Sequence, residues 1–241
     1  MTLLNKAILA FALTTLVAVG VSHAQSQQRP RPQQPAAKPV AAAEPPAAPA
    51  GASNVMSAKS ADITGFRSAK FGMTEAEVRA AIVKDFRVKP EDIREQPNPG
   101  ERTKALLVNV ADVLPGGGIG EVTYVFGYQS QKLIQVSVNW SKATDPKMTP
   151  EQLFSNSSVL RTHFLGEGFK PDSVATNMPI NGGILIFRGS DASDRTAMMI
   201  LQGTFAQGEN NQRILTPTAL LLFYIADAKA PDIYRLPAGS F

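Results

Sequence analysis

Two helix starts of the same kind stand 75 residues apart in this chain and predict a repeated unit. They are Met73-Thr74-Glu75-Ala76-Glu77-Val78 and Met148-Thr149-Pro150-Glu151-Gln152-Leu153. In each, the Thr hydroxyl can accept a first-turn backbone N–H, and the side chain three residues later can reach back to the Thr N–H, which makes a reciprocal capping box. The Met before each cap is placed for a hydrophobic staple with Val78 or Leu153.

The segments after each helix start predict strands. Helices are expected from Thr74 to about Phe86 and from Thr149 to Leu165, with a loop at 90–101. The expected strands are 104–114, 121–126, 133–140, 183–188, 196–203 and 217–226. The last three of these strands, 183–188, 196–203 and 217–226, are almost continuously apolar, which is typical of strands buried on both faces. We therefore predict an α+β fold of two tandem αβββ units, with helices on one face of one or two antiparallel sheets.

The strand at 133–140 shows the clearest alternation. Ile134, Val136, Val138 and Trp140 fall on one side and are expected to pack beneath a helix, while Gln135, Ser137 and Asn139 point to the other side. Tyr128 lies in the hairpin before this strand and is an aromatic residue with a polar tip, a kind favoured at interfaces. These four residues, Tyr128, Gln135, Ser137 and Asn139, are the predicted binding residues.

The N-terminus is typical of an exported protein. Lys6 precedes the largely apolar run Ala7–Val21, and Ser22-His23-Ala24-Gln25 suits a signal peptidase that cleaves after Ala24. Fifteen apolar residues fall short of the roughly 20 that span a membrane. We expect a periplasmic or secreted protein, with membrane association only if the signal is retained.

Composition sets the remaining boundaries. Residues 25–58 are rich in Pro, Ala and Gln and are expected to form a disordered tail. The predicted organisation is a signal peptide (1–24), this tail (25–58), a first αβββ unit (59–143) and a second (144–241).

Of the net charge of +4, +3 lies in residues 1–58, so the remainder is almost neutral and nucleic acid is not expected as a partner.

Groups for catalysis or cofactor binding are few. The chain has no Cys, and after cleavage His163 is the one histidine left. The glycine-rich stretch 115–120 lacks the Lys-Ser/Thr pair of a phosphate loop and is expected to be a mobile connection between strands. Asp191 and Asp194 offer too few ligands for calcium and suit a hairpin turn. We therefore expect no cofactor, no metal and no catalytic residue.

Two resemblances to known families accompany these patterns. A helix followed by three strands, occurring twice, resembles the β-lactamase inhibitor protein family. The segment Phe71-Gly72-Met73-Thr74-x-x-x-Val78 is similar to the helix start of the SmpA/OmlA outer-membrane assembly lipoproteins, although their lipid-bearing cysteine is missing. The resemblance implies a periplasmic or secreted module that binds another protein through its sheet face, and it supplies no catalytic residue.

Two functions remain open from the sequence. The first is a non-enzymatic module that binds another protein of the cell envelope through an open sheet face. The alternative is a periplasmic hydrolase that acts on envelope glycan through paired carboxylates, because a carboxylate pair is defined by its separation in space and not along the chain.

Overall fold

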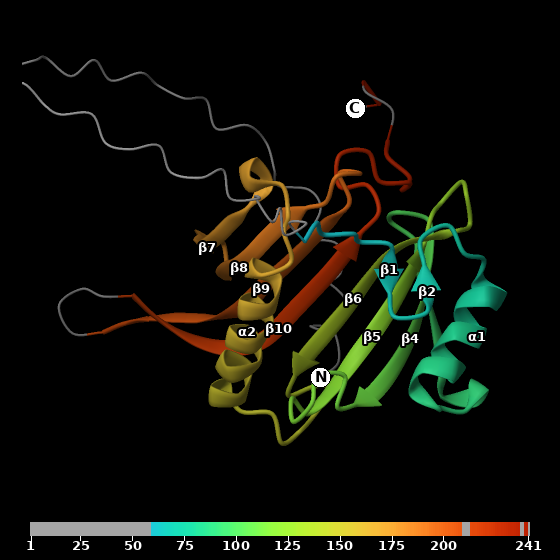
Figure 1. Cartoon of the computed structure of the whole chain (residues 1–241). Helices are drawn as coiled ribbons and strands as arrows, with labels where there is room; N and C mark the ends of the chain where they lie inside the picture. The colour runs from blue at the N-terminus through green and yellow to red at the C-terminus, as the bar shows by residue number, and fades with distance from the viewer. Residues whose placement is uncertain (1–58, 209–212, 237–238, 241) are drawn as a thin grey trace, which may run out of the picture. The chain divides into compact units, whose positions relative to one another are not determined.

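The computed structural model describes residues 59–208, 213–236 and 239–240, and Figure 1 shows their arrangement. Two helices and a large antiparallel sheet confirm the predicted α+β class. The elements in chain order are β1 (Gly65–Phe66), β2 (Ala69–Lys70), α1 (Glu75–Phe86), η1 (Pro90–Asp92), β3 (Arg94–Asn98), β4 (Thr103–Ala111), β5 (Ile119–Phe126), β6 (Leu133–Ser141), α2 (Pro150–Leu165), η2 (Pro171–Ser173), β7 (Ala175–Ile180), β8 (Gly183–Ser190), β9 (Thr196–Gln207) and β10 (Arg213–Ile225).

All strands from β3 to β10 belong to one sheet, which resolves the choice between one sheet and two. Its order is β3-β4-β5-β6-β10-β9-β8-β7, and every neighbouring pair is antiparallel. The final strand after each helix, β6 or β10, therefore lies at the centre, and the two strands pair from Ser141↔Ala219 to Gln135↔Ile225.

Each helix is followed by a 3-10 turn and four strands, where three strands were expected. The additional strands are β3, inside the predicted loop at 90–101, and β7. Pro97 and Pro179 interrupt their strand patterns, and both strands lie at sheet edges, where a missing backbone N–H is tolerated. Because proline interrupts their sequence patterns, these two strands were not predicted.

The two helix starts are alike only in part. Thr74 accepts from Glu77 N at 3.4 Å, and a Glu77 carboxylate oxygen accepts from Thr74 N at 2.7 Å, which completes the predicted capping box. Thr149 likewise accepts from Gln152 N at 3.2 Å. The Gln152 side chain, however, donates to Gly116 O and Asn156 Oδ1, so the second box is half made.

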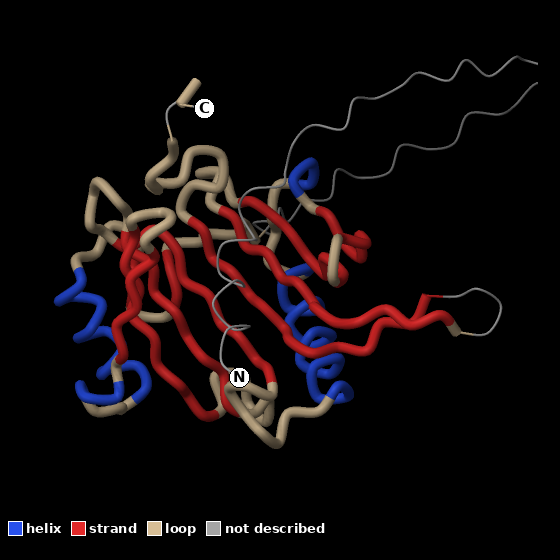
Figure 2. The backbone as a smooth tube through the Cα atoms, turned by 180° about the vertical axis from the view of Figure 1, so that it is seen from behind, coloured by secondary structure: helices blue, strands red, loops and turns tan. Residues whose placement is uncertain are grey.

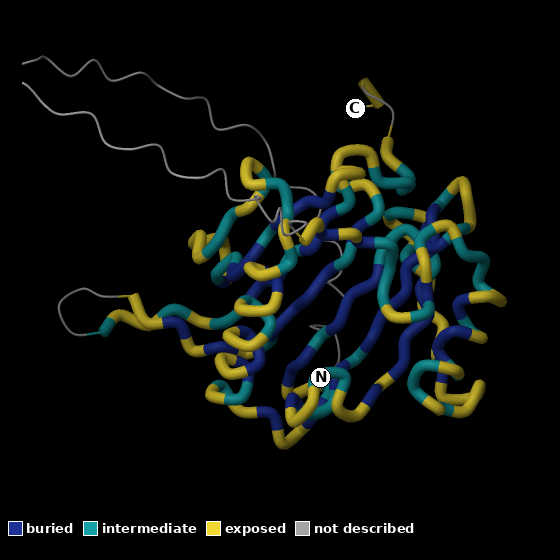
Figure 3. Tube along the Cα trace, viewed as in Figure 1, coloured by how far each residue is buried: buried dark blue, intermediate teal, exposed yellow. Residues whose placement is uncertain are grey.

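Both helices pack on the same face of the sheet. Val78 and Ile82 of α1 and Leu153 and Phe164 of α2 belong to one buried cluster with the sheet. One row of this helix-side face crosses six strands: Val108, Val122, Val138, Leu222, Met199 and Phe187. Figure 3 shows the buried segments running along the central strands.

The register of β6 confirms the predicted alternation except at one residue. Val136, Val138 and Trp140 lie in the helix-side core, as expected. A bulge displaces the register between Val125 and Phe126, so that Leu133 takes the core position. Ile134 packs with Ala105, Leu107 and Val125 on the opposite face. The prediction that Ile134 packs beneath a helix was therefore wrong.

The C-terminal segment is tied to the rest of the fold by hydrogen bonds. Asp232 accepts from Gln129 N at 3.0 Å and Ser130 N at 2.9 Å, and its carbonyl accepts from Tyr128 N. Tyr234 N donates to Glu101 O. Hydrogen bonds to the Ser130 side chain and to the two backbone N–H groups lower the pKa of the Asp232 carboxyl. We call residues 226–236 the C-terminal strap.

Candidate functional site

The side of the sheet opposite the helices is the candidate site, and we call it the helix-free face. Among the described residues, neither helix lies over it (Figure 2). The cross-strand register assigns its residues. One row reads Arg94, Leu107, Thr123, Ser137, Phe223, Met198 and Arg188, and the next reads Asn109, Glu121, Asn139, Leu221, Ile200, Leu185 and Met178.

Three of the four predicted binding residues stand side by side on this face. Gln135, Ser137 and Asn139 form a polar strip along β6, in the middle of the sheet. Gln135 and Asn139 are half-buried, whereas Ser137 is buried between its neighbours Thr123 and Phe223. The strip is therefore more enclosed than an ordinary solvated strand surface.

Tyr128 has a different setting. It lies in the β5–β6 turn, and its ring meets Tyr234 edge-on at 5.6 Å, while the Arg102 guanidinium lies 3.7 Å from the centre of the Tyr234 ring. Its backbone N–H donates to Asp232 O. Tyr128 thus helps to hold the C-terminal strap, and its described contacts do not join it to the β6 strip.

Apolar side chains flank the polar strip on both sides. The larger group consists of Ile200, Leu221, Phe223 and Ile225 on β9 and β10, with Leu185 and Met198 packed against them. The smaller group is Ala105, Leu107 and Val125 on β4 and β5. Strand parity had indicated the polar strip but not the larger apolar group, whose only sequence signal was continuous hydrophobicity.

Charge is unevenly distributed across the same face. Arg94 at the β3 edge donates to Glu121 Oε2 at 2.7 Å and to Asn109 Oδ1 at 3.0 Å. Arg188, at the other end of that row, forms no ion pair with any described residue. Asn139 Oδ1 is buried and has no hydrogen-bond partner within the described ranges. The apolar group therefore lies between an unpaired cation and an unpaired acceptor.

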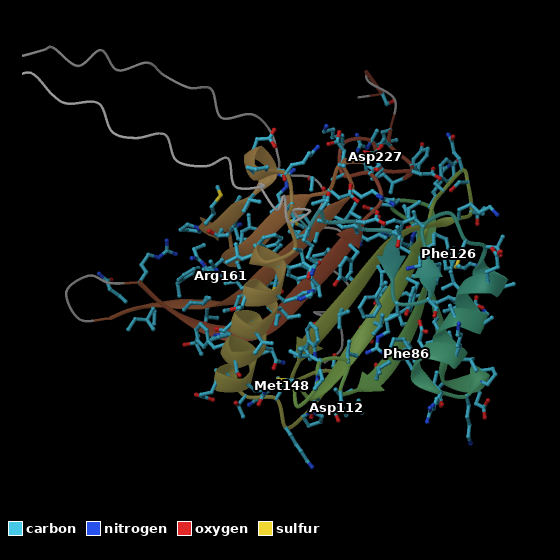
Figure 4. All side chains as sticks on the ribbon, in the orientation of Figure 1. Phe86, Asp112, Phe126, Met148, Arg161 and Asp227 are labelled. Carbon is cyan, nitrogen blue, oxygen red and sulfur yellow. The ribbon has the colours of Figure 1, made fainter. Side chains whose placement is uncertain are left out.

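The glycine-rich stretch 115–120 connects β4 to β5, as expected, and contacts α2 and the turn before it. Asn156 donates to Gly117 O at 2.9 Å, and Asp145 accepts from Ile119 N at 3.1 Å. A Cβ on Gly118 would lie 2.8 Å from Asp145 Oδ2. Figure 4 shows Met148 and Asp112 at this same end of the sheet.

The carboxylates of Asp191 and Asp194, between β8 and β9, form hydrogen bonds and ion pairs within the fold. Asp191 accepts from Ile63 N and from the backbone and side chain of Arg195. Asp194 pairs with Lys170 and, at 2.9 Å, with Lys229. Hydrogen bonds from these two lysines lower the pKa of Asp194 to about 2. Within the described ranges, no group of three or more His, Asp or Glu side chains could hold a metal ion.

Two further features bear on catalysis. His163 is exposed on α2, with its Nδ1 atom 3.4 Å from Glu167 Oε1 and its ring beside Phe164. A hollow of about 440 Å³ opens between α1 and η1, and its lining contains no carboxylate: Arg79, Ala80, Val83, Lys84, Pro90 and Ile93. The hollow therefore offers no carboxylate pair, and the His163–Glu167 pair lies at the exposed end of α2 and not in this hollow.

Comparisons with protein-family models, with curated proteins and with solved structures gave no match. In the part of the chain that the structure describes, neither helix has the length and apolar character needed to cross a membrane. The helix-free face therefore has to be interpreted from its own geometry and chemistry.

Proposed function

We propose that this protein is an exported, non-enzymatic protein-binding module of the cell envelope that contacts its partner through the helix-free face. The observation that carries the proposal is the surface itself: apolar groups on both sides of a polar strip, with no described helix above them. Apolar area with a few polar groups that fix orientation is the usual composition of an interface core.

The dimensions of the face support this proposal. Six strands from β4 to β8 span about 29 Å at a strand spacing of about 4.8 Å, and seven residues extend about 24 Å along a strand. These dimensions give a footprint of about 700 Å² in the plane of the sheet, wide enough to lie against a partner domain.

The sequence supports the compartment in this proposal. The apolar run Ala7–Val21, followed by Ala24-Gln25, suits export and cleavage. The similarity of Phe71–Arg79 to outer-membrane assembly lipoproteins, and of the helix-and-sheet order to the β-lactamase inhibitor family, also favours a periplasmic or secreted binding module.

The test compares two faces of the same protein. Immobilised mature chain (25–241) is exposed to envelope extract as wild type, as Gln135→Arg, as Asn139→Arg and as the matched control Ser158→Arg on the exposed side of α2. We expect both β6 variants to lose the partner that the wild type and the control retain. Urea midpoints of all four proteins are measured beside binding, so that loss of the partner is distinguished from loss of the fold.

Two results would refute this function. One is retention of the same partner by both β6 variants. The other is turnover of envelope glycan by the purified mature chain, which would support the hydrolase alternative instead.

A further inference from the structure

The large apolar side chains that reach the surface are gathered in one part of the molecule. Eight such side chains are exposed in the described ranges. Seven of them belong to α2, to β7 with the residue before it, and to β10, and the eighth is Leu236 in the C-terminal strap. A single exposed apolar residue is normal, but a group of them marks a surface that contacts a partner or a membrane.

The first half of the fold has the same elements without this surface. The order α1, η1 and β3–β6 recurs as α2, η2 and β7–β10, yet no exposed large apolar side chain in the described ranges precedes Phe154. At one edge of the sheet, β3 carries Arg94 and Glu95, and both form ion pairs. At the other edge, β7 carries no charged residue, although charge is a common protection of edge strands. The order of elements therefore does not require an apolar surface here.

An arm extends this surface beyond the sheet. The ladders with β8 and β6 stop before residues 204–207 and 213–216, which pair with each other (Figure 1). Ile214 is 54% exposed on this arm, and the Arg213 guanidinium lies 4.3 Å from the centre of the Phe205 ring. The arm thus carries an apolar side chain and a cation past the neighbouring strands. We call α2, β7 and the arm the apolar end.

Exposed apolar side chains lie on both sides of the sheet at the apolar end. Met178 and Ile180 are two residues apart on β7 and point to the helix-free side. On the helix side, Phe154 and Leu165 are about three turns apart on α2 and share one flank of the helix. The opposite flank contacts the glycine-rich stretch through Asn156, so the flank with Phe154 faces β7 and β8. A folded partner would have to wrap around the edge to contact both sides, whereas a fluid lipid surface can surround it.

Charge indicates the kind of lipid. Within their described bounds, the strands β7 to β10 contain no Asp or Glu, and α2 has only Glu151, in its first turn. Arg161 lies on the α2 flank that faces β7 and β8 (Figure 4), Arg188 lies on β8, and Arg213 lies on the arm. None of these three forms an ion pair with a described residue. Unpaired cations beside exposed apolar side chains suit a surface of anionic headgroups over hydrocarbon.

The backbone of β7 is a poor template for a strand from another protein. Pro179 has no N–H to donate, and Asn177 has a φ of 54°, which interrupts the extended conformation. Edge strands that pair with other chains need a continuous row of donors and acceptors. The edge therefore favours a contact through side chains over a contact through strand pairing.

We propose that the apolar end lies edge-on against an anionic lipid surface, with Met178, Ile180 and Ile214 among the headgroups and Arg188 and Arg213 toward the lipid phosphates. This inference goes beyond the proposed function and does not depend on a partner at the polar strip of β6. It also does not require the signal peptide to be retained, because the contact is made by the folded part of the chain.

Co-sedimentation of the mature chain (25–241) with vesicles tests the contact. Vesicles of phosphatidylcholine alone are compared with vesicles of phosphatidylcholine and phosphatidylglycerol in equal parts. Each cation close to an anionic surface changes the affinity about fivefold, so we expect the anionic vesicles to be preferred by at least about tenfold.

Two variants with matched controls locate the contact. Arg213→Glu should weaken binding to the anionic vesicles by at least about fivefold, whereas Lys84→Glu, the same charge change on exposed α1, should have less than about half that effect. Ile214→Ser should weaken binding by about fivefold or more, whereas Leu236→Ser, which removes the exposed apolar side chain outside the apolar end, should leave it unchanged. Circular dichroism and urea midpoints verify that each variant is folded.

The absence of cysteine allows insertion to be observed directly. Chains carrying Ile214→Cys or Lys84→Cys are labelled with the environment-sensitive fluorophore NBD. On anionic vesicles, we expect the emission of the label at position 214 to shift to shorter wavelength and that of the label at position 84 to stay unchanged.

Four results would overturn the inference. Absence of binding to the anionic vesicles would refute the lipid contact, and equal binding to both vesicles would refute the role of the cations. Binding that neither Arg213→Glu nor Ile214→Ser weakens more than its control would place the contact outside the apolar end. Loss of an envelope partner by Arg213→Glu, without vesicle binding, would identify a protein site instead. The function proposed for the polar strip is tested separately by Gln135→Arg and is not decided by these results.

Discussion

Asp191 provides the sharpest test of the energetics of this fold. Its carboxylate, with a side chain only 1% exposed, accepts from Ile63 N at 2.8 Å, Ser193 N at 2.9 Å, Arg195 N at 3.0 Å and Arg195 Nε at 2.9 Å. It thereby joins the segment before β1 to the β8–β9 turn. Asp191→Ala removes all four acceptor contacts at once.

The expected loss follows from these contacts. Each buried donor left without a partner costs about 1–3 kcal/mol, and breaking a buried ion pair typically costs about 3–5 kcal/mol. Water can reach part of Arg195, whose side chain is 24% exposed, so we expect a total loss of about 3–5 kcal/mol. This is a large fraction of the roughly 5–15 kcal/mol that stabilises a domain.

Urea unfolding of the mature chain measures this loss, and Asp194→Asn is the control in the same turn. Asp194 is half exposed, its lysine partners lie at the surface, and asparagine tolerates its positive φ of 64°. The control should therefore lose less stability than Asp191→Ala. A loss below about 1 kcal/mol for Asp191→Ala, or an equal loss for both variants, would contradict the argument.

Four further predictions address other parts of the molecule. Amino-terminal sequencing of protein from a native periplasmic fraction should begin at Gln25, and recovery of Met1 from a membrane pellet would contradict export. Thr74→Ala and Thr149→Ala should each cost about 1 kcal/mol in urea unfolding through loss of a helix cap. The pKa of Asp194 is lowered to about 2 in the folded state, so the carboxylate stabilises the fold fully above its unfolded pKa of about 3.9. This stabilisation is lost as the pH falls toward 2. Asp194→Asn should remove that part of the pH dependence, as measured by urea titrations from about pH 5 to 2. Asp232→Ala should accelerate tryptic cleavage after Arg235 by releasing the C-terminal strap, and an unchanged rate would argue against a role of Asp232 in holding it.

Short sequence patterns predicted the two helix starts and most of the side-chain alternation along β6. The Thr74 and Thr149 caps fixed both helix starts, and period-two alternation placed Val136, Val138 and Trp140 in the core. Ile134 was misplaced because a bulge adds one residue between two otherwise regular strands, and no property of the residue itself reveals that displacement.

The candidate site was predictable only in part. Parity assigned Gln135, Ser137 and Asn139 to the face opposite the helices, because residues two apart on a strand share a side. The apolar cluster around Leu221 and Phe223 was not recognised as part of that face. Continuous hydrophobicity indicates burial on both sides of a strand but does not show which element covers each side.

The position of β10 at the centre of the sheet affects how the chain reaches its folded state. Strand β6 can pair with β5 as soon as their hairpin forms, but its other edge has no partner until Ala219–Ile225 have been synthesised. Until then, β6 presents an unpaired strand edge, which is a template for pairing with other chains. The closing contact also joins residues far apart in sequence, which slows folding. Under the proposed export, this order would be an advantage, because the sheet cannot close around its centre while the last strand is still outside the compartment.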